Sequence, residues 1–138
     1  MPKKRYLLDP VGRTARIAAI GAMENGDEAL SILLSSCRDI LISSYEEADD
    51  PTLLAEKRAD QVLKGVVVAA EESGYGFRKL VTATIIGLIH GSTEVGANPR
   101  RVAVACVKAV EEACKRAGLN AQEGIREGIR AAIRAGEE

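Results

Sequence analysis

Apolar residues recur every three or four positions along most of the chain, as they do on one face of an amphipathic helix. The segment 51–73 shows this spacing in the series Ala55, Ala59, Val62, Leu63, Val66, Ala69 and Ala70. No segment alternates between apolar and polar residues over five or more positions, the pattern typical of a half-buried strand. The pattern therefore predicts an all-α protein.

An aspartate or asparagine followed by proline stands directly before three of the helical stretches. The three pairs are Asp9-Pro10, Asp50-Pro51 and Asn98-Pro99. The side-chain oxygen of the aspartate or asparagine can accept hydrogen bonds from the amides of the first turn. Proline has no N–H, but at the first position of a helix an N–H would have no partner within the helix, so proline is tolerated there. We therefore expect a helix to begin at each of these prolines.

A glycine follows each of these helices, and a second helical pattern begins within two residues of it. The glycines are Gly26, Gly74 and Gly118. Glycine adopts the left-handed conformation at a helix end without the steric cost of a side chain. The sequence thus predicts three consecutive αα-hairpins of about 40–48 residues that form a six-helix bundle. The expected helices are 10–25, 28–47, 51–73, 76–93, 99–117 and 120–136.

Residues 1–8 are predicted to form a basic N-terminal tail, and residues 9–138 a single all-α domain. The stretch 76–93 is apolar on nearly every side, so we expect it in the centre of the bundle. Its most apolar part, 80–89, has about ten residues where a membrane-spanning helix needs about twenty. We therefore predict no membrane partner.

The chain has 138 residues, of which 46% are hydrophobic and 28% charged, a balance typical of one globular domain. A net charge of −1 gives no electrostatic argument for nucleic acid or a membrane as an obligate partner. The basic residues at the N-terminus are followed by only three apolar residues, too few for a signal peptide, so we predict a cytoplasmic protein. We expect Cys37, Cys106 and Cys114 to be buried, reduced thiols.

Small residues recur every four positions in two of the expected helices. They are Ala83, Gly87 and Gly91 in one, and Gly124, Gly128, Ala132 and Gly136 in the other. A glycine inside a helix costs up to about 1 kcal/mol relative to alanine, so we expect another helix to approach closely at these positions. That helix can belong to the same chain or to a second copy, and the sequence leaves both interpretations open.

The second interpretation predicts a homo-oligomer, most simply a dimer, formed in part by the last helix. The terminal helix of a repeat array usually turns a polar face outward, whereas this one carries isoleucines beside its glycines. The candidate interface residues are Gly124, Ile125, Gly128, Ile129, Ala132 and Ile133. A different protein partner also remains open.

His90 is the only histidine, and Glu94 lies one helical turn after it, where a carboxylate can orient the imidazole. With Tyr75 these residues are the candidates for a small-ligand site. The competing interpretation is a histidine that hydrogen-bonds a late carbonyl of its own helix. Without a second histidine, a Glu-x-x-His pair, a P-loop or a nucleophile elbow, we predict no metal, no cofactor and no catalytic residue.

Arginines recur every four positions in the last helix, a spacing that can follow the phosphates of a nucleic acid. The candidate anion contacts are Arg126, Arg130 and Arg134, with Arg100 and Arg101 after the last Asn-Pro pair. Glu123 and Glu127 each stand three residues before one of these arginines. They favour the simpler interpretation of a solvated face with weak ion pairs.

These observations favour a non-catalytic helical assembly or protein-interaction domain that is homo-oligomeric. One alternative is a small-ligand-binding protein or an enzyme with a cavity near His90 and Glu94. Another is a nucleic-acid-associated protein that uses the arginines of the last helix and the basic N-terminus, Lys3, Lys4 and Arg5.

Overall fold

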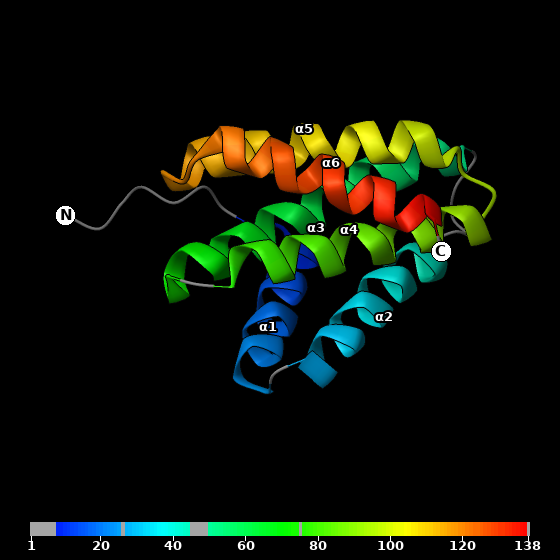
Figure 1. Cartoon of the computed structure of the whole chain (residues 1–138). Helices are drawn as coiled ribbons and strands as arrows, with labels where there is room; N and C mark the ends of the chain where they lie inside the picture. Colours follow the sequence, from blue (N-terminus) through cyan, green and yellow to red (C-terminus); the bar gives the residue numbers. More distant parts are fainter. Residues whose placement is uncertain (1–7, 26, 45–49, 75, 138) are drawn as a thin grey trace.

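The computed structural model describes residues 8–25, 27–44, 50–74 and 76–137, and this part of the chain contains six helices and no strand (Figure 1). The helices are α1 (Pro10–Asn25), α2 (Asp27–Ser44), α3 (Pro51–Ser73), α4 (Phe77–Glu94), α5 (Pro99–Ala117) and α6 (Ala121–Glu137). The all-α class and the predicted series of three hairpins are confirmed. None of the six helices is both long and apolar enough to cross a membrane.

The three Asx-Pro pairs begin helices as predicted. The Asp50 carboxylate accepts hydrogen bonds from the amides of Thr52 (3.0 Å) and Leu53 (3.2 Å). Asp9 accepts from the Gly12 amide at 2.8 Å. Asn98 caps α5 in the same way. These short-range bonds satisfy amides that have no partner within the helix.

Two of the three predicted glycine stops end helices in the expected conformation. Gly74 after α3 and Gly118 after α5 both have φ of 76°, in the left-handed region. The third, Gly26, lies outside the described residues, as do the last residues of the predicted helix 28–47. The turn before α4 differs from the others, because α4 is preceded by Gly76 with φ of 83° and has no side-chain cap.

The hairpins stack in the order of the sequence. The first helices of the hairpins form one row, in which α1 packs on α3 and α3 on α5, and the second helices form another, α2 on α4 and α4 on α6. Across the described ranges, no helix of the first hairpin packs extensively on a helix of the third. Figure 1 shows these three layers, with α5 and α6 at the top and α1 and α2 at the bottom. The middle hairpin is therefore covered on both sides and each end hairpin on only one.

The predicted central position of α4 is confirmed. It contacts α2, α3, α5 and α6, and most of its residues from Leu80 to Ser92 are buried. Glycines let the stacked helices approach closely. A Cβ atom on Gly87 would lie 2.2 Å from the carbonyl oxygen of Leu34 in α2, and one on Gly65 of α3 would lie 2.0 Å from that of Gly12 in α1. Any larger residue at Gly65 or Gly87 would force two backbones apart.

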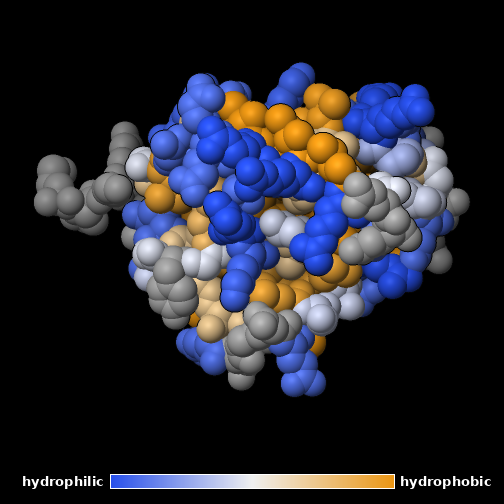
Figure 2. Space-filling view, viewed as in Figure 1, coloured by the Kyte–Doolittle hydropathy of each residue, from blue (hydrophilic) through white to orange (hydrophobic). Residues whose placement is uncertain are grey.

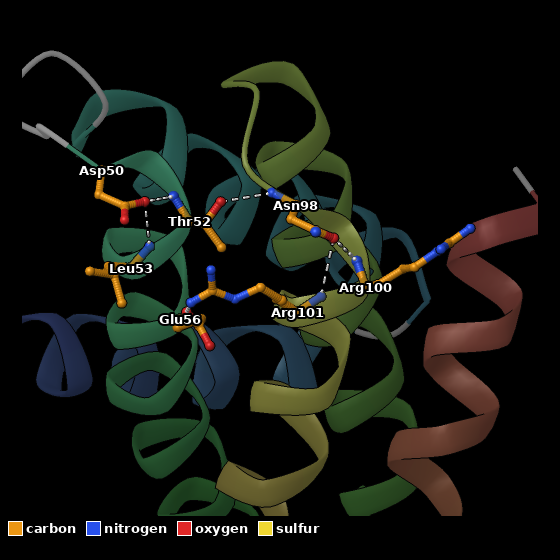
Figure 3. A network of polar contacts seen from close by, with 7 residues as sticks. All are labelled: Asp50, Thr52, Leu53, Glu56, Asn98, Arg100 and Arg101. Carbon is orange, nitrogen blue, oxygen red and sulfur yellow. Dashed lines mark hydrogen bonds and ion pairs between the residues drawn. The ribbon is translucent and has the colours of Figure 1, made fainter.

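Polar contacts join the starts of α3 and α5 (Figure 3). The Asn98 amide donates to the Thr52 hydroxyl at 3.0 Å, and the Asn98 side chain accepts from the amides of Arg100 and Arg101. Arg101 also pairs with Glu56 at 2.6 Å. The residues that start two successive hairpins are thus linked to each other, which holds their first helices in register.

Candidate functional site

Two of the three glycines of α6, Gly124 and Gly128, face the interior of their own chain. Both Gly124 and Gly128 are buried. A Cβ on Gly124 would lie 2.8 Å from the Cys114 sulfur of α5, and one on Gly128 would lie 3.4 Å from a Val107 methyl of α5. The helix that approaches these two glycines therefore belongs to the same chain, which is one of the two interpretations of the four-residue spacing. They offer no surface to a second copy in this fold.

The remaining candidate interface residues of α6 do reach the surface. Ile125 and Ala132 are half-buried, and Ile129 and Ile133 are exposed. Ile129 lies two residues after Glu127, which pairs with Arg78 of α4, so Ile129 points about 160° away from α4. These isoleucines therefore belong to the side of the third hairpin that faces away from the stack.

An exposed valine of α5 extends the same side. Val104 lies between the fully buried Val102 and Cys106, two residues from each, and so also points about 160° away from the core. In Figure 2 a hydrophobic band crosses the top of the molecule, where Figure 1 places α5 and α6. We call this surface the α5–α6 end face, made of Arg100, Val104, Lys108, Glu111, Lys115, Arg126, Ile129 and Ile133.

The first hairpin has a matching outward surface at the other end of the stack. Ile32 lies about 160° around α2 from Leu34, whose carbonyl contacts α4, and Ile17 lies about 140° around α1 from Gly12, which contacts α3. Beside Ile32 is a cavity of about 440 Å³ between α1 and α2. We call this surface the α1–α2 end face, made of Arg13, Ile17, Ala18, Gly21, Glu24, Glu28, Ile32 and Asp39.

The two end faces carry opposite charge. The exposed ionised residues of the α1–α2 end face are three carboxylates and one guanidinium, namely Glu24, Glu28, Asp39 and Arg13. Those of the α5–α6 end face are four cations, Arg100, Lys108, Lys115 and Arg126, beside the half-buried Glu111. Each of these charged residues stands three, four, seven or eleven positions from an exposed apolar residue of its own helix. At these spacings the charged and the apolar side chain lie on the same side of the helix.

A third surface is a cavity of about 470 Å³ between α2, α4 and α6. Apolar side chains, including Leu34, Ala83, Ile86 and Ala131, contribute to its lining. Four cations also line it, Arg78 and Lys79 of α4 and Arg130 and Arg134 of α6. We call it the basic groove, defined by these eight residues and Glu127.

Glu127 is the one carboxylate of the basic groove, and its side chain is only 3% exposed. It pairs with Arg78 at 3.2 Å and with Arg130 at 3.4 Å, whereas both arginines are largely exposed. A buried carboxylate needs such partners, because an unpaired charge out of water is costly. Glu127 therefore positions two of the groove's guanidinium groups.

The predicted anion contacts do not form one site. Arg130 and Arg134 line the basic groove, whereas Arg126 belongs to the α5–α6 end face. Arg101 is engaged with Glu56 and Arg100 is exposed at the start of α5. The arginines of α6 therefore border two of these surfaces, with Arg130 and Arg134 in the basic groove and Arg126 on the α5–α6 end face.

Of the predicted ligand site, the structure describes His90 and Glu94. Tyr75 lies outside the described residues. Glu94, expected to orient His90, pairs with Arg38 of α2, while His90 is half-buried near the end of α4. The described residues contain no cluster of three or more histidine, cysteine or acidic side chains that could hold a metal ion.

The cysteines also offer little chemistry at neutral pH. All three are buried and none forms a disulfide. Burial raises the pKa of Cys37 and Cys106 to about 12 and that of Cys114 to about 11. Because the thiolate is the nucleophile, these thiols are poorly reactive.

Several surface residues were not singled out from the sequence. Arg78 and Lys79 join the groove only because α4 packs between α2 and α6. Glu127, expected on a solvated face with weak ion pairs, is instead buried. Its sequence signal was its place three residues after Gly124 and four before Ala131, on the buried face of α6. Isolated apolar residues such as Ile17 and Ile32 carry no such signal.

No protein-family model matches this chain, and neither a curated protein nor a solved structure was found that resembles it. The surfaces themselves therefore carry the functional argument.

Proposed function

We propose that this chain is a non-catalytic assembly domain that binds copies of itself through the outward faces of its end hairpins. The observation that carries the proposal is where the large apolar side chains are exposed. Of six such residues in the described part of the chain, five lie on the end hairpins, and each is 47–67% exposed. They are Ile17 and Ile32 of the first hairpin and Val104, Ile129 and Ile133 of the third.

A stack that ends in solvent normally has polar outer faces on its terminal repeats, because each inner repeat relies on a neighbour to cover its apolar side. Here the covered middle hairpin has one exposed large apolar residue in the described ranges, Leu53, and the uncovered hairpins have the other five. Grouped apolar residues rimmed by charges are typical of protein-binding surfaces. Further copies of the chain would supply the missing neighbours.

Sedimentation equilibrium of the wild-type protein tests this proposal. We expect a weight-average mass that exceeds 14.7 kDa at micromolar concentration and rises with concentration. A compact monomer of 14.7 kDa across that range would refute self-association.

The basic groove supports a second function, the binding of an acidic amphipathic helix from another protein. Helix recognition commonly places an apolar helix face in an apolar groove, and charges at the rim set the choice of partner. Here the apolar lining suits such a face, and the four cations suit carboxylates beside it. The rim would reject a basic helix of the same shape.

Fluorescence anisotropy with two synthetic amphipathic helices, identical except for an acidic or a basic polar face, tests this function. We expect only the acidic helix to bind, and the substitution Arg134→Glu to weaken its binding about tenfold. Lys57→Glu, on the exposed side of α3 and absent from the groove lining, is the matched control and should bind like the wild type. Equal binding of both helices would exclude the basic groove as a charge-selective site.

A further inference from the structure

The two end faces occupy equivalent ends of the stack. The middle hairpin is covered by the first hairpin on one side and by the third on the other. A further hairpin that packed on α5 and α6 would therefore continue the stack. It would contact them through the side that corresponds to the uncovered side of the first hairpin. The α1–α2 end face of a second copy is such a side.

The shapes of the two end faces fit this arrangement. Ile129 and Ile133 are four residues apart on α6, so their side chains form a ridge along the helix. The α1–α2 end face contains a cavity of about 440 Å³ between its helices. Gly21 lines it, and a Cβ built there would meet no other atom within 4 Å. The ridge of one copy can enter the space between α1 and α2 of another.

Charge decides between the ways in which two copies can meet. If two α5–α6 end faces met, four cations would face four cations, and two α1–α2 end faces would likewise oppose their carboxylates. An α5–α6 end face on an α1–α2 end face instead places four cations against three carboxylates, with Glu111 and Arg13 as the one opposite charge on each side. Like charges opposed across an interface are costly, so the charge pattern selects the unlike pair.

We propose that copies of this chain associate head to tail, with the α5–α6 end face of one copy on the α1–α2 end face of the next. The inference rests on the self-association proposed above and adds its direction. A head-to-tail contact leaves one unused face at each end of every open oligomer. Growth therefore continues until a ring closes or the concentration limits the length, in contrast to the two-fold dimer expected from the sequence.

Two complementary variants test the direction. Ile133→Asp places a carboxylate among the apolar residues of the α5–α6 end face, and Ile32→Asp does so on the α1–α2 end face. Both side chains are exposed in the single chain, so we expect circular dichroism to show native helix content in each. Leu53→Asp is the matched control, because Leu53 is equally exposed but lies on the middle hairpin.

Sedimentation velocity then compares five samples at the same micromolar concentration: the wild type, each end-face variant, their equimolar mixture and the Leu53→Asp control. Head-to-tail association predicts that each end-face variant alone is a monomer, because one half of every contact is blocked. An equimolar mixture should form a species of twice 14.7 kDa and nothing larger, because each variant keeps the face that the other lacks. The Leu53→Asp control should assemble like the wild type.

Other results overturn the inference. If Ile32→Asp assembles like the wild type, or if mixing fails to restore a dimer, copies do not meet head to tail, although self-association itself stands. If the wild type is a monomer, the proposed function fails and this inference fails with it. Ile17→Asp and Ile129→Asp repeat the test, should one of the first variants lose its helix content.

Discussion

The same spacing of small residues serves different purposes in α4 and in α6. In α4, Gly87 and Gly91 meet the backbone of α2, and a Cβ on either would lie within 3 Å of a carbonyl oxygen, that of Leu34 or that of Arg38. In α6 the atoms nearest to a Cβ on Gly124 or Gly128 belong to side chains of α5 instead, and Gly136 meets nothing within 4 Å. A small residue every four positions therefore shows where close approach is allowed and not where it occurs.

The physical difference lies in what can move. A side chain such as that of Cys114 can rotate away from an added methyl group, whereas a carbonyl oxygen moves only with its helix. Substitutions in α6 should therefore cost less stability than those in α4, and at Gly128 the change in stability should reverse its sign.

The largest effect is expected at Gly87. A Cβ there would lie 2.2 Å from the Leu34 carbonyl oxygen, so Gly87→Ala must separate α2 from α4. We expect a loss of stability of about 3 kcal/mol or more, after the gain of up to about 1 kcal/mol in helix propensity. Urea unfolding followed by circular dichroism measures the change. A variant as stable as the wild type would show that α2 and α4 are not held at this distance.

A buried thiol lies beside a glycine in both helices, which makes stability depend on pH. Cys37 packs on Gly87 and Cys114 on Gly124. Burial raises the pKa of Cys37 from 9.0 to about 12 and that of Cys114 to about 11, so the unfolded chain loses these protons first. The contribution of each thiol is complete below about pH 9 and declines as the pH rises toward its folded value.

We expect stability to fall by about 1.4 kcal/mol per thiol for each pH unit above 9. Urea unfolding at pH 8 and pH 10, with Cys37→Ala as the comparison, separates this effect from that of lysines and tyrosines. The variant should lose less stability than the wild type over this interval. Equal losses in the two proteins would argue against a buried, neutral Cys37.

A smaller effect is expected for Gly124→Ala. The new Cβ would lie 2.8 Å from the Cys114 sulfur, which can shift, and alanine favours the helix by up to about 1 kcal/mol. We expect a net loss of about 1 kcal/mol or less. Adding Cys114→Ala should remove the closest contact and leave a Val110 methyl at 3.0 Å, so a double-mutant cycle by urea unfolding should show coupling between Gly124 and Cys114. Strict additivity would mean that Gly124 and Cys114 do not touch.

The smallest effect, with the opposite sign, is expected for Gly128→Ala. Its nearest neighbour would be a Val107 methyl at 3.4 Å, an ordinary contact, so the helix propensity of alanine decides the outcome. We expect a gain of up to about 1 kcal/mol. Thermal unfolding measures it, and the oligomeric state should stay unchanged because Gly128 faces α5. A loss of stability or of assembly would place Gly128 at a contact between copies after all.

The exposed residues show how far sequence patterns reach. Ile129 and Ile133 could be proposed as surface residues from the sequence because isoleucine is unusual on a terminal helix. Ile17 and Ile32 could not, since an isolated isoleucine fits a core position equally well. The basic groove was also beyond prediction, because its cations come from two helices that are far apart in the chain.

The sequence by itself determined where the first helix of each hairpin begins. Asp9, Asp50 and Asn98 cap their helices through hydrogen bonds that span no more than three residues, so the signal and its effect are neighbours in the chain. Only the tertiary structure decided which side of each hairpin is covered, which glycines meet a backbone, and that Glu127 pairs with Arg78 of α4. Helical periodicity shows which residues share a face of a helix but not which element packs against that face. Whether the face is buried or exposed depends on that packing partner.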